Sequence, residues 1–157
     1  MALSDTEKEQ IEQFCKKYPD RKSAIMDSLR MIQQSRRYIP VEERGELAVI
    51  LDMPEKDIQG VISFYTMYTE KPLGKHHIQV CTNVSCKLRG SDEIYEFVKE
   101  QTNLTNGETD PDGLFSLEEV ECMGACGGAP MIAVNEHYYE KIDKETISKL
   151  LGSLKAL

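Results

Sequence analysis

The first 73 residues have the apolar spacing of amphipathic helices, with apolar side chains recurring three and four positions apart. Four such stripes predict four short helices: Ile11, Phe14, Cys15 and Tyr18; Ile25, Leu29 and Ile32; Leu47, Ala48 and Leu51; Ile58, Val61, Ile62 and Tyr65. Ser4 and Glu7 have the form of a capping box that begins the first helix. Pro40 breaks the chain, and Pro54 fits the first turn of the fourth helix. We therefore expect a helical bundle over residues 1–73.

The pattern changes after residue 73, where short alternating segments appear between turns. They predict four strands, over His77–Cys81, Leu114–Glu121, Met131–Val134 and Tyr138–Ile142. Ser91 and Asp143 are expected to cap two helices, each with one apolar face, and Cys81 to Gly90 is expected to be a loop. The order β-α-β-β-β-α predicts an α/β domain over residues 74–157. The fold class is therefore α/β, a helical bundle followed by an α/β domain.

Composition and charge exclude several classes of protein. The chain is 40% hydrophobic and 29% charged, which is typical of a folded globular protein. We find no apolar run long enough to cross a membrane and no secretory signal, so we expect a cytoplasmic protein that reaches a membrane only through partners. The net charge of −8 disfavours nucleic acid as a partner. The segment that ends at Tyr68 has the outline of a DNA-binding helix-turn-helix, but its second helix, within residues 55–68, contains only one basic residue, Lys56, with which to contact bases.

The strongest chemical signal is a set of four cysteines in two loops. Cys81 and Cys86 have four residues between them, Cys122 and Cys126 have three, and 35 residues separate the two pairs. Each pair follows a predicted strand, so parallel strands would bring all four thiols to one end of the sheet. Soft thiolate ligands of this kind suit an iron–sulfur cluster. The second loop contains Gly124, Gly127 and Gly128, which suit a chain that bends tightly around a cluster.

Spacing alone leaves other interpretations of these cysteines open. Structural zinc accepts loops of this length, so a zinc-stabilised interaction module is an alternative. A thioredoxin-type dithiol needs C-x-x-C, which the chain lacks, and disulfides are disfavoured in a reducing compartment. Cys15 lies on a helical apolar stripe and is expected to be a buried thiol outside the set. We expect neither His76 nor His77 to be a ligand, because four cysteines complete the set.

Beyond spacing, the residues themselves resemble a known family. Residues 81–86 read Cys-Thr-Asn-Val-Ser-Cys, and residues 121–130 read Glu-Cys-Met-Gly-Ala-Cys-Gly-Gly-Ala-Pro. Both segments, and the gap between them, resemble the thioredoxin-like [2Fe–2S] ferredoxin family. Tyr38-Ile-Pro40 and residues 61–65 resemble it as well, so the likeness covers nearly the whole chain. It implies a thioredoxin-like ferredoxin fold for residues 74–157.

The same resemblance implies a ligand set and a role. The ligands of one [2Fe–2S] cluster would be Cys81, Cys86, Cys122 and Cys126, and none of them would be a nucleophile. The chain would be an electron-transfer subunit of NADH-quinone oxidoreductase, in a larger complex at the inner membrane. A partner flavoprotein would carry FMN and bind NADH, and residues 1–73 would dock onto it. A cytosolic NAD-linked hydrogenase or formate dehydrogenase is the alternative parent enzyme.

Two further expectations concern activity and docking. The chain has no G-x-G-x-x-G turn, so we expect no NADH oxidation without the flavoprotein. Phe64, Tyr65 and Tyr68 form an aromatic group that is either core or a partner-facing patch.

Overall fold

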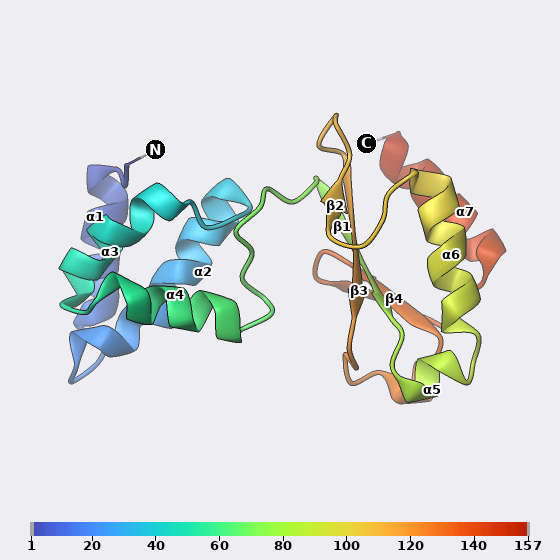
Figure 1. Ribbon diagram of the computed structural model, residues 1–157, viewed down its shortest axis with the longest axis horizontal. Coiled ribbons are helices and arrows are strands. Elements are labelled where there is room, and N and C mark those ends of the chain that lie inside the picture. Colours follow the sequence, from blue (N-terminus) through green and yellow to red (C-terminus); the bar gives the residue numbers. More distant parts are fainter. Residues whose placement is uncertain (1, 157) are drawn as a thin grey trace. The chain divides into compact units, whose positions relative to one another are not determined.

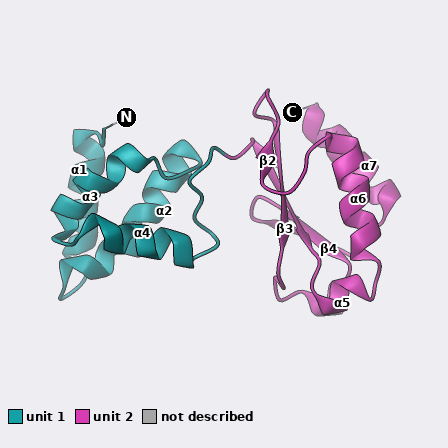
Figure 2. Ribbon diagram, in the orientation of Figure 1, with its two compact units in different colours: residues 1–72 teal, residues 73–157 magenta. Residues whose placement is uncertain are grey.

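The computed structural model describes residues 2–156 and divides into two compact units, residues 1–72 and 73–157 (Figure 2). The division falls one residue before the boundary expected from the sequence. Each unit has its own hydrophobic core, as a separate domain must. The α/β class, with helices at the N-terminus and a sheet after them, is confirmed. No helix within residues 2–156 has the length and apolar character needed to span a membrane.

Unit 1 is helical. Its elements are α1 (Asp5–Cys15), a 3-10 turn (Arg21–Ala24), α2 (Ile25–Arg36), α3 (Val41–Leu51) and α4 (Glu55–Phe64). The predicted capping box is present at the start of α1: Ser4 accepts a hydrogen bond from the Glu7 backbone, and the Glu7 carboxylate accepts one from Ser4. Pro54 lies one residue outside α4, at its N-cap, instead of in its first turn. The predicted stripes form the core, except that Tyr18 and Tyr65 lie at the surface.

The chain after α4 folds back along α2. The Gln33 side chain donates to the Met67 carbonyl at 2.6 Å and accepts from the Thr69 backbone N–H at 2.8 Å. The Tyr68 hydroxyl donates to the Met26 carbonyl at 3.1 Å, and its side chain is 8% exposed. Tyr68 therefore belongs to the core of unit 1, whereas Phe64 is 77% exposed.

Unit 2 is a mixed sheet with helices on one face (Figure 1). The strands are β1 (His76–Cys81), β2 (Glu108–Thr109), β3 (Phe115–Val120), β4 (Met131–Val134) and β5 (His137–Glu140), in the order β2-β3-β1-β4-β5. The helices are α5 (Val84–Lys87), α6 (Ser91–Thr102) and α7 (Lys144–Lys155), with a 3-10 turn at Cys126–Gly128. The main core lies between the sheet and the helices α6 and α7.

Two local predictions in unit 2 were wrong. The segment expected to be a loop after Cys81 contains the short helix α5, which is too brief to show an apolar period. Ser91 does not cap α6; Gly90 holds the cap position with a φ of 87°, and the Ser91 hydroxyl is buried inside the first turn. Asp143 does cap α7, because its carboxylate accepts from the Thr146 backbone N–H at 2.8 Å.

Candidate metal centre

The two cysteine loops lie at the same end of the sheet because β1 and β3 are parallel neighbours. Cys81 is the last residue of β1 and is in register with Val120, the last residue of β3. Cys86 lies in α5, directly after β1, while Cys122 and Cys126 follow β3. The strands ahead of the two loops are therefore parallel, as the clustering of the four thiols at one end requires.

The four thiols form two pairs. The Cys122 and Cys126 sulfur atoms are 3.4 Å apart, and the Cys81 thiol is close enough to the Cys86 thiol to raise its pKa. The pairs lie close enough for Cys126 to interact electrostatically with both Cys81 and Cys86. Within residues 2–156, no three His, Cys, Asp or Glu side chains converge on one point that would hold a single metal ion.

The two pairs differ in their exposure. Cys81 and Cys86 are 2% exposed and pack with Ala129 and Met131 in a small apolar cluster. Cys122 and Cys126 lie at the surface. One pair is thus anchored in the protein and the other faces outward, an arrangement that keeps a bound redox group near the surface of unit 2.

The protonation of the thiols follows from these surroundings. Burial, together with the neighbouring Cys81, raises the pKa of Cys86 to about 11. The Gly124 backbone N–H donates to the Cys122 sulfur at 3.4 Å, and this bond, followed by the one with Cys126, lowers the pKa of Cys122. Gly124 has a φ of 82°, which lets the loop turn back toward the sulfur. Backbone donors that stabilise thiolate are typical of iron–sulfur sites.

Side chains from other elements hold the loops in place. The Asn83 amide, which caps α5, donates to the Glu121 carboxylate and so ties the first loop to the second. The Tyr138 hydroxyl of β5 donates to the Met123 carbonyl at 3.1 Å. These supporting roles of Asn83 and Tyr138 were not predictable from the sequence, because both contacts join segments that are distant along the chain.

The other candidates lie elsewhere. Cys15 is buried in the core of unit 1, and its thiol faces the Arg21 carbonyl at 4.0 Å. The His77 ring contacts the Ser116 hydroxyl at 2.8 Å and the Glu118 carboxylate at 3.0 Å on the sheet. His76 is buried against the Phe115 ring. These side chains have structural surroundings of their own, away from the four thiols.

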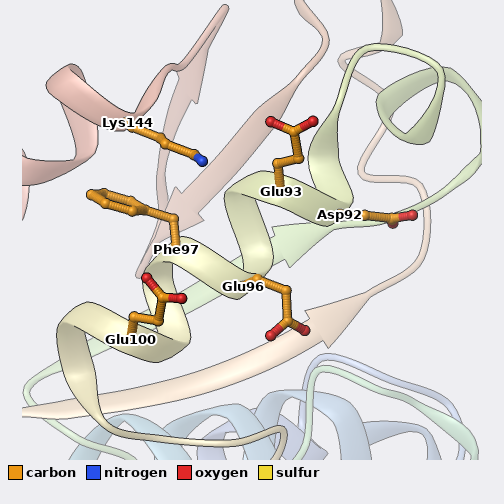
Figure 3. Close-up of a pocket in the computed structure, with 6 residues that line it drawn as sticks. All are labelled: Asp92, Glu93, Glu96, Phe97, Glu100 and Lys144. Carbon is orange, nitrogen blue, oxygen red and sulfur yellow. The ribbon is translucent and has the colours of Figure 1, made fainter.

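A groove of about 300 Å³ lies between α6 and α7 (Figure 3). Its lining is acidic, with one lysine and one aromatic ring: Asp92, Glu93, Glu96, Phe97, Glu100 and Lys144. The Lys144 ammonium lies 5.8 Å from the centroid of the Phe97 ring. None of the cysteines lines it, so this solvated acidic surface is separate from the metal centre.

Taken together, the donor set fits a two-iron cluster. Each iron of a [2Fe–2S] cluster takes two protein ligands, usually thiolates. Here two thiol pairs lie near one another at one end of the sheet, with a backbone N–H already directed at one sulfur. Cys81 and Cys86 would form one pair of ligands, and Cys122 with Cys126 the other.

Comparison with known proteins agrees with this geometry. The family model described as "Thioredoxin-like [2Fe-2S] ferredoxin" matches residues 11–155. NADH-quinone oxidoreductase subunit 2 of Thermus thermophilus is 40% identical over 159 residues, covering 99% of this chain and 88% of that protein. An NADH-quinone oxidoreductase subunit of Rickettsia bellii is 41% identical over 147 residues, covering 92% of this chain and 88% of that protein.

A solved structure shows the same fold at lower sequence similarity. The crystal structure of an NAD⁺-reducing [NiFe]-hydrogenase contains a chain that matches with a TM-score of 0.71 at 20% identity. The match covers 82% of this chain and 22% of the hydrogenase chain. The family match spans both units and includes all four cysteines of the candidate metal centre. The chain therefore belongs to the thioredoxin-like [2Fe–2S] ferredoxin family.

Proposed function

We propose that this chain holds one [2Fe–2S] cluster on Cys81, Cys86, Cys122 and Cys126 and serves as an electron-transfer subunit of an NADH-quinone oxidoreductase. The observation that carries the proposal is that both thiol pairs lie at one end of the sheet, after two parallel strands, in a member of this family. The relatives at about 40% identity are subunits of that oxidoreductase and match this chain almost end to end. The parent enzyme is therefore an oxidoreductase complex.

The residues of this chain would bind and orient the cluster. When bound, a [2Fe–2S] cluster supplies one-electron redox chemistry. Cys81 and Cys86 hold it against the apolar cluster of Ala129 and Met131, which limits the access of water from that side. The exposed Cys122 and Cys126 leave the other side open to a partner. The Gly124 N–H stabilises negative charge on the Cys122 sulfur.

The electron source would be a partner flavoprotein that carries FMN and oxidises NADH. We place docking of that partner partly on unit 1, at an apolar patch made of Phe64, Tyr65 and Met67. These side chains are 77%, 38% and 62% exposed, and the Phe64 and Tyr65 rings are in edge contact at 5.0 Å. Aromatic side chains and methionine are enriched at protein interfaces. The membrane would be reached through the rest of the complex.

Two other functions make different predictions. The hydrogenase likeness, at 20% identity, reflects a shared fold and does not favour that parent enzyme. A zinc-stabilised interaction module would draw its donors around a single ion. The match of residues 11–155 to the thioredoxin-like [2Fe–2S] ferredoxin family favours the two-iron interpretation over zinc.

The deciding experiment is anaerobic purification followed by metal analysis and electron paramagnetic resonance after dithionite reduction. About two iron and two sulfide per chain, with a reduced S = 1/2 signal, is the expected result. Stoichiometric zinc in a colourless, EPR-silent protein from iron-supplemented cells would refute the proposal. The loaded chain should not oxidise NADH alone, and its cluster should be reduced by NADH once the flavoprotein is added.

A further inference from the structure

Tyr138 and Gly124 contact the same peptide group from opposite ends. The Tyr138 hydroxyl donates to the Met123 carbonyl oxygen at 3.1 Å, and the Gly124 N–H donates to the Cys122 sulfur at 3.4 Å. The Met123 carbonyl and the Gly124 N–H belong to one planar amide, whose resonance couples its oxygen to its nitrogen. The contacts therefore form a continuous chain from the Tyr138 hydroxyl to the Cys122 sulfur.

Hydrogen bonds that are linked in this way strengthen one another. A hydrogen bond accepted by an amide oxygen polarises the amide and makes its N–H a better donor, by about 10–30% per bond. The N–H in question is the one that lowers the pKa of Cys122 by stabilising the thiolate. A donor that stabilises negative charge on a ligand sulfur also favours the more negatively charged, reduced form of a cluster, and so raises its reduction potential.

We infer that Tyr138 is a positioning residue that raises the reduction potential of the cluster through the Met123–Gly124 peptide, without touching a ligand itself. The inference rests on the proposed function, because it concerns the cluster that the four cysteines would hold. Tyr138 suits the task, since it comes from the regular strand β5 and not from the loop. Its position is thereby fixed independently of the residues that it orients.

The neighbouring Tyr139 provides a matched control. It is in register with Ile132 of the neighbouring strand β4. Its side chain packs against the main core of unit 2, on the opposite face of β5 from Tyr138. Tyr138 is 52% exposed, so Tyr138→Phe removes one oxygen atom from the surface and leaves the core unchanged. Tyr139→Phe removes the same atom from the adjacent residue but from a side chain outside the hydrogen-bond chain.

The test is an EPR-monitored redox titration of the full chain with its cluster, for wild type, Tyr138→Phe and Tyr139→Phe. Tyr138→Phe should lower the equilibrium constant for reduction about two- to fourfold, which corresponds to about 20–35 mV for a one-electron couple. Tyr139→Phe should leave the potential unchanged. Thermal unfolding of all three proteins checks that the fold is intact.

Two results would overturn the inference: a Tyr138→Phe potential equal to that of wild type, or equal shifts in both variants. Equal shifts would mean that any hydroxyl on β5 acts through general stability or solvation. A wild-type chain that shows no [2Fe–2S] signal would instead refute the proposed function, and the inference with it. The two failures are thus distinguishable in one set of samples.

Discussion

Arg36 of α2 binds Glu7 of α1 through two parallel contacts, Nη1 to Oε1 at 2.6 Å and Nη2 to Oε2 at 3.0 Å. Its Nε also donates to Glu43 of α3 at 2.5 Å, and the Glu43 side chain is completely buried. One guanidinium therefore joins three helices of unit 1. The Arg36 and Glu7 side chains are only 10% and 18% exposed, so solvent screens these pairs little.

Removing this guanidinium should be strongly destabilising. Arg36→Ala leaves the Glu43 carboxylate buried without its cation, a change that typically costs about 3–5 kcal/mol. Urea unfolding followed by circular dichroism should show the loss in unit 1. Lys149→Ala is the control, because the Lys149–Glu145 pair is 74% and 76% exposed and should leave the unfolding midpoint unchanged. Equal behaviour of the two variants would contradict a structural role for the buried network.

Acid should destabilise unit 1 through Glu7. The bonds from Arg36 hold the pKa of Glu7 at about 2, below its ordinary value of 4.5. A depressed pKa contributes stability that is present above pH 4.5 and is lost as the pH falls toward 2, with an upper limit of roughly 3 kcal/mol. Burial raises the pKa of Glu43, so its protonation acts in the opposite sense as the pH falls.

The Glu7→Gln variant separates these two effects. It retains Glu43 but removes the group whose pKa is lowered, so its unfolding free energy should vary less between pH 4.5 and 2 than that of wild type. Chemical denaturation at a series of pH values measures the slope of the unfolding free energy against pH for wild type and for Glu7→Gln. If the slopes coincide, Glu7 does not contribute to the acid sensitivity.

We expect four of the five cysteines to be cluster ligands and the fifth, Cys15, to take no part in binding the cluster. Cys126→Ala removes one thiol of the exposed pair and should abolish the wild-type EPR signal and lower the iron content. Cys15→Ala should retain two iron per chain, because Cys15 lies in the core of unit 1. Iron and sulfide analysis of the two purified variants measures the difference. A wild-type signal from Cys126→Ala would remove Cys126 from the ligand set.

The aromatic residues at the end of α4 and just after it should also differ in role, with Phe64 binding the partner and Tyr68 stabilising the fold. Phe64→Ala should weaken binding to the flavoprotein at least about tenfold while leaving the melting temperature unchanged, since Phe64 is exposed. Tyr68→Ala should instead lower the melting temperature, because it removes a buried ring and its bond to the Met26 carbonyl. Calorimetric titration and thermal unfolding measure the two effects. Unchanged affinity in Phe64→Ala would place docking elsewhere.

Features encoded over a few consecutive residues were predictable from the sequence. The capping residues Ser4 and Asp143 begin the expected helices, because each bonds a backbone N–H only three residues away. The strand ahead of Cys81 was also recognised, since its alternation is visible locally.

Features that depend on distant residues were not predictable. The parallel pairing of β1 with β3 was only a condition in the sequence analysis, because strand order is set by packing across many residues. The Tyr138 contact with Met123 joins two segments whose proximity requires the whole β4–β5 hairpin. Whether Tyr65 and Tyr68 were core or surface depended on how the chain after α4 folds back onto α2.

The short connection between the two units has a consequence for how the chain binds a larger assembly. Glu70 of unit 1 is held by the Arg44 guanidinium at 2.7 Å, and Gly74 of unit 2 lies against the Phe115 backbone, so the chain passes from one unit to the other within residues 71–73. If both units contact one partner, the first contact confines the second to a small volume, at an effective concentration that a long linker would not give. Two weak contacts would then act as one durable attachment, and lengthening this connection would loosen it without altering either surface.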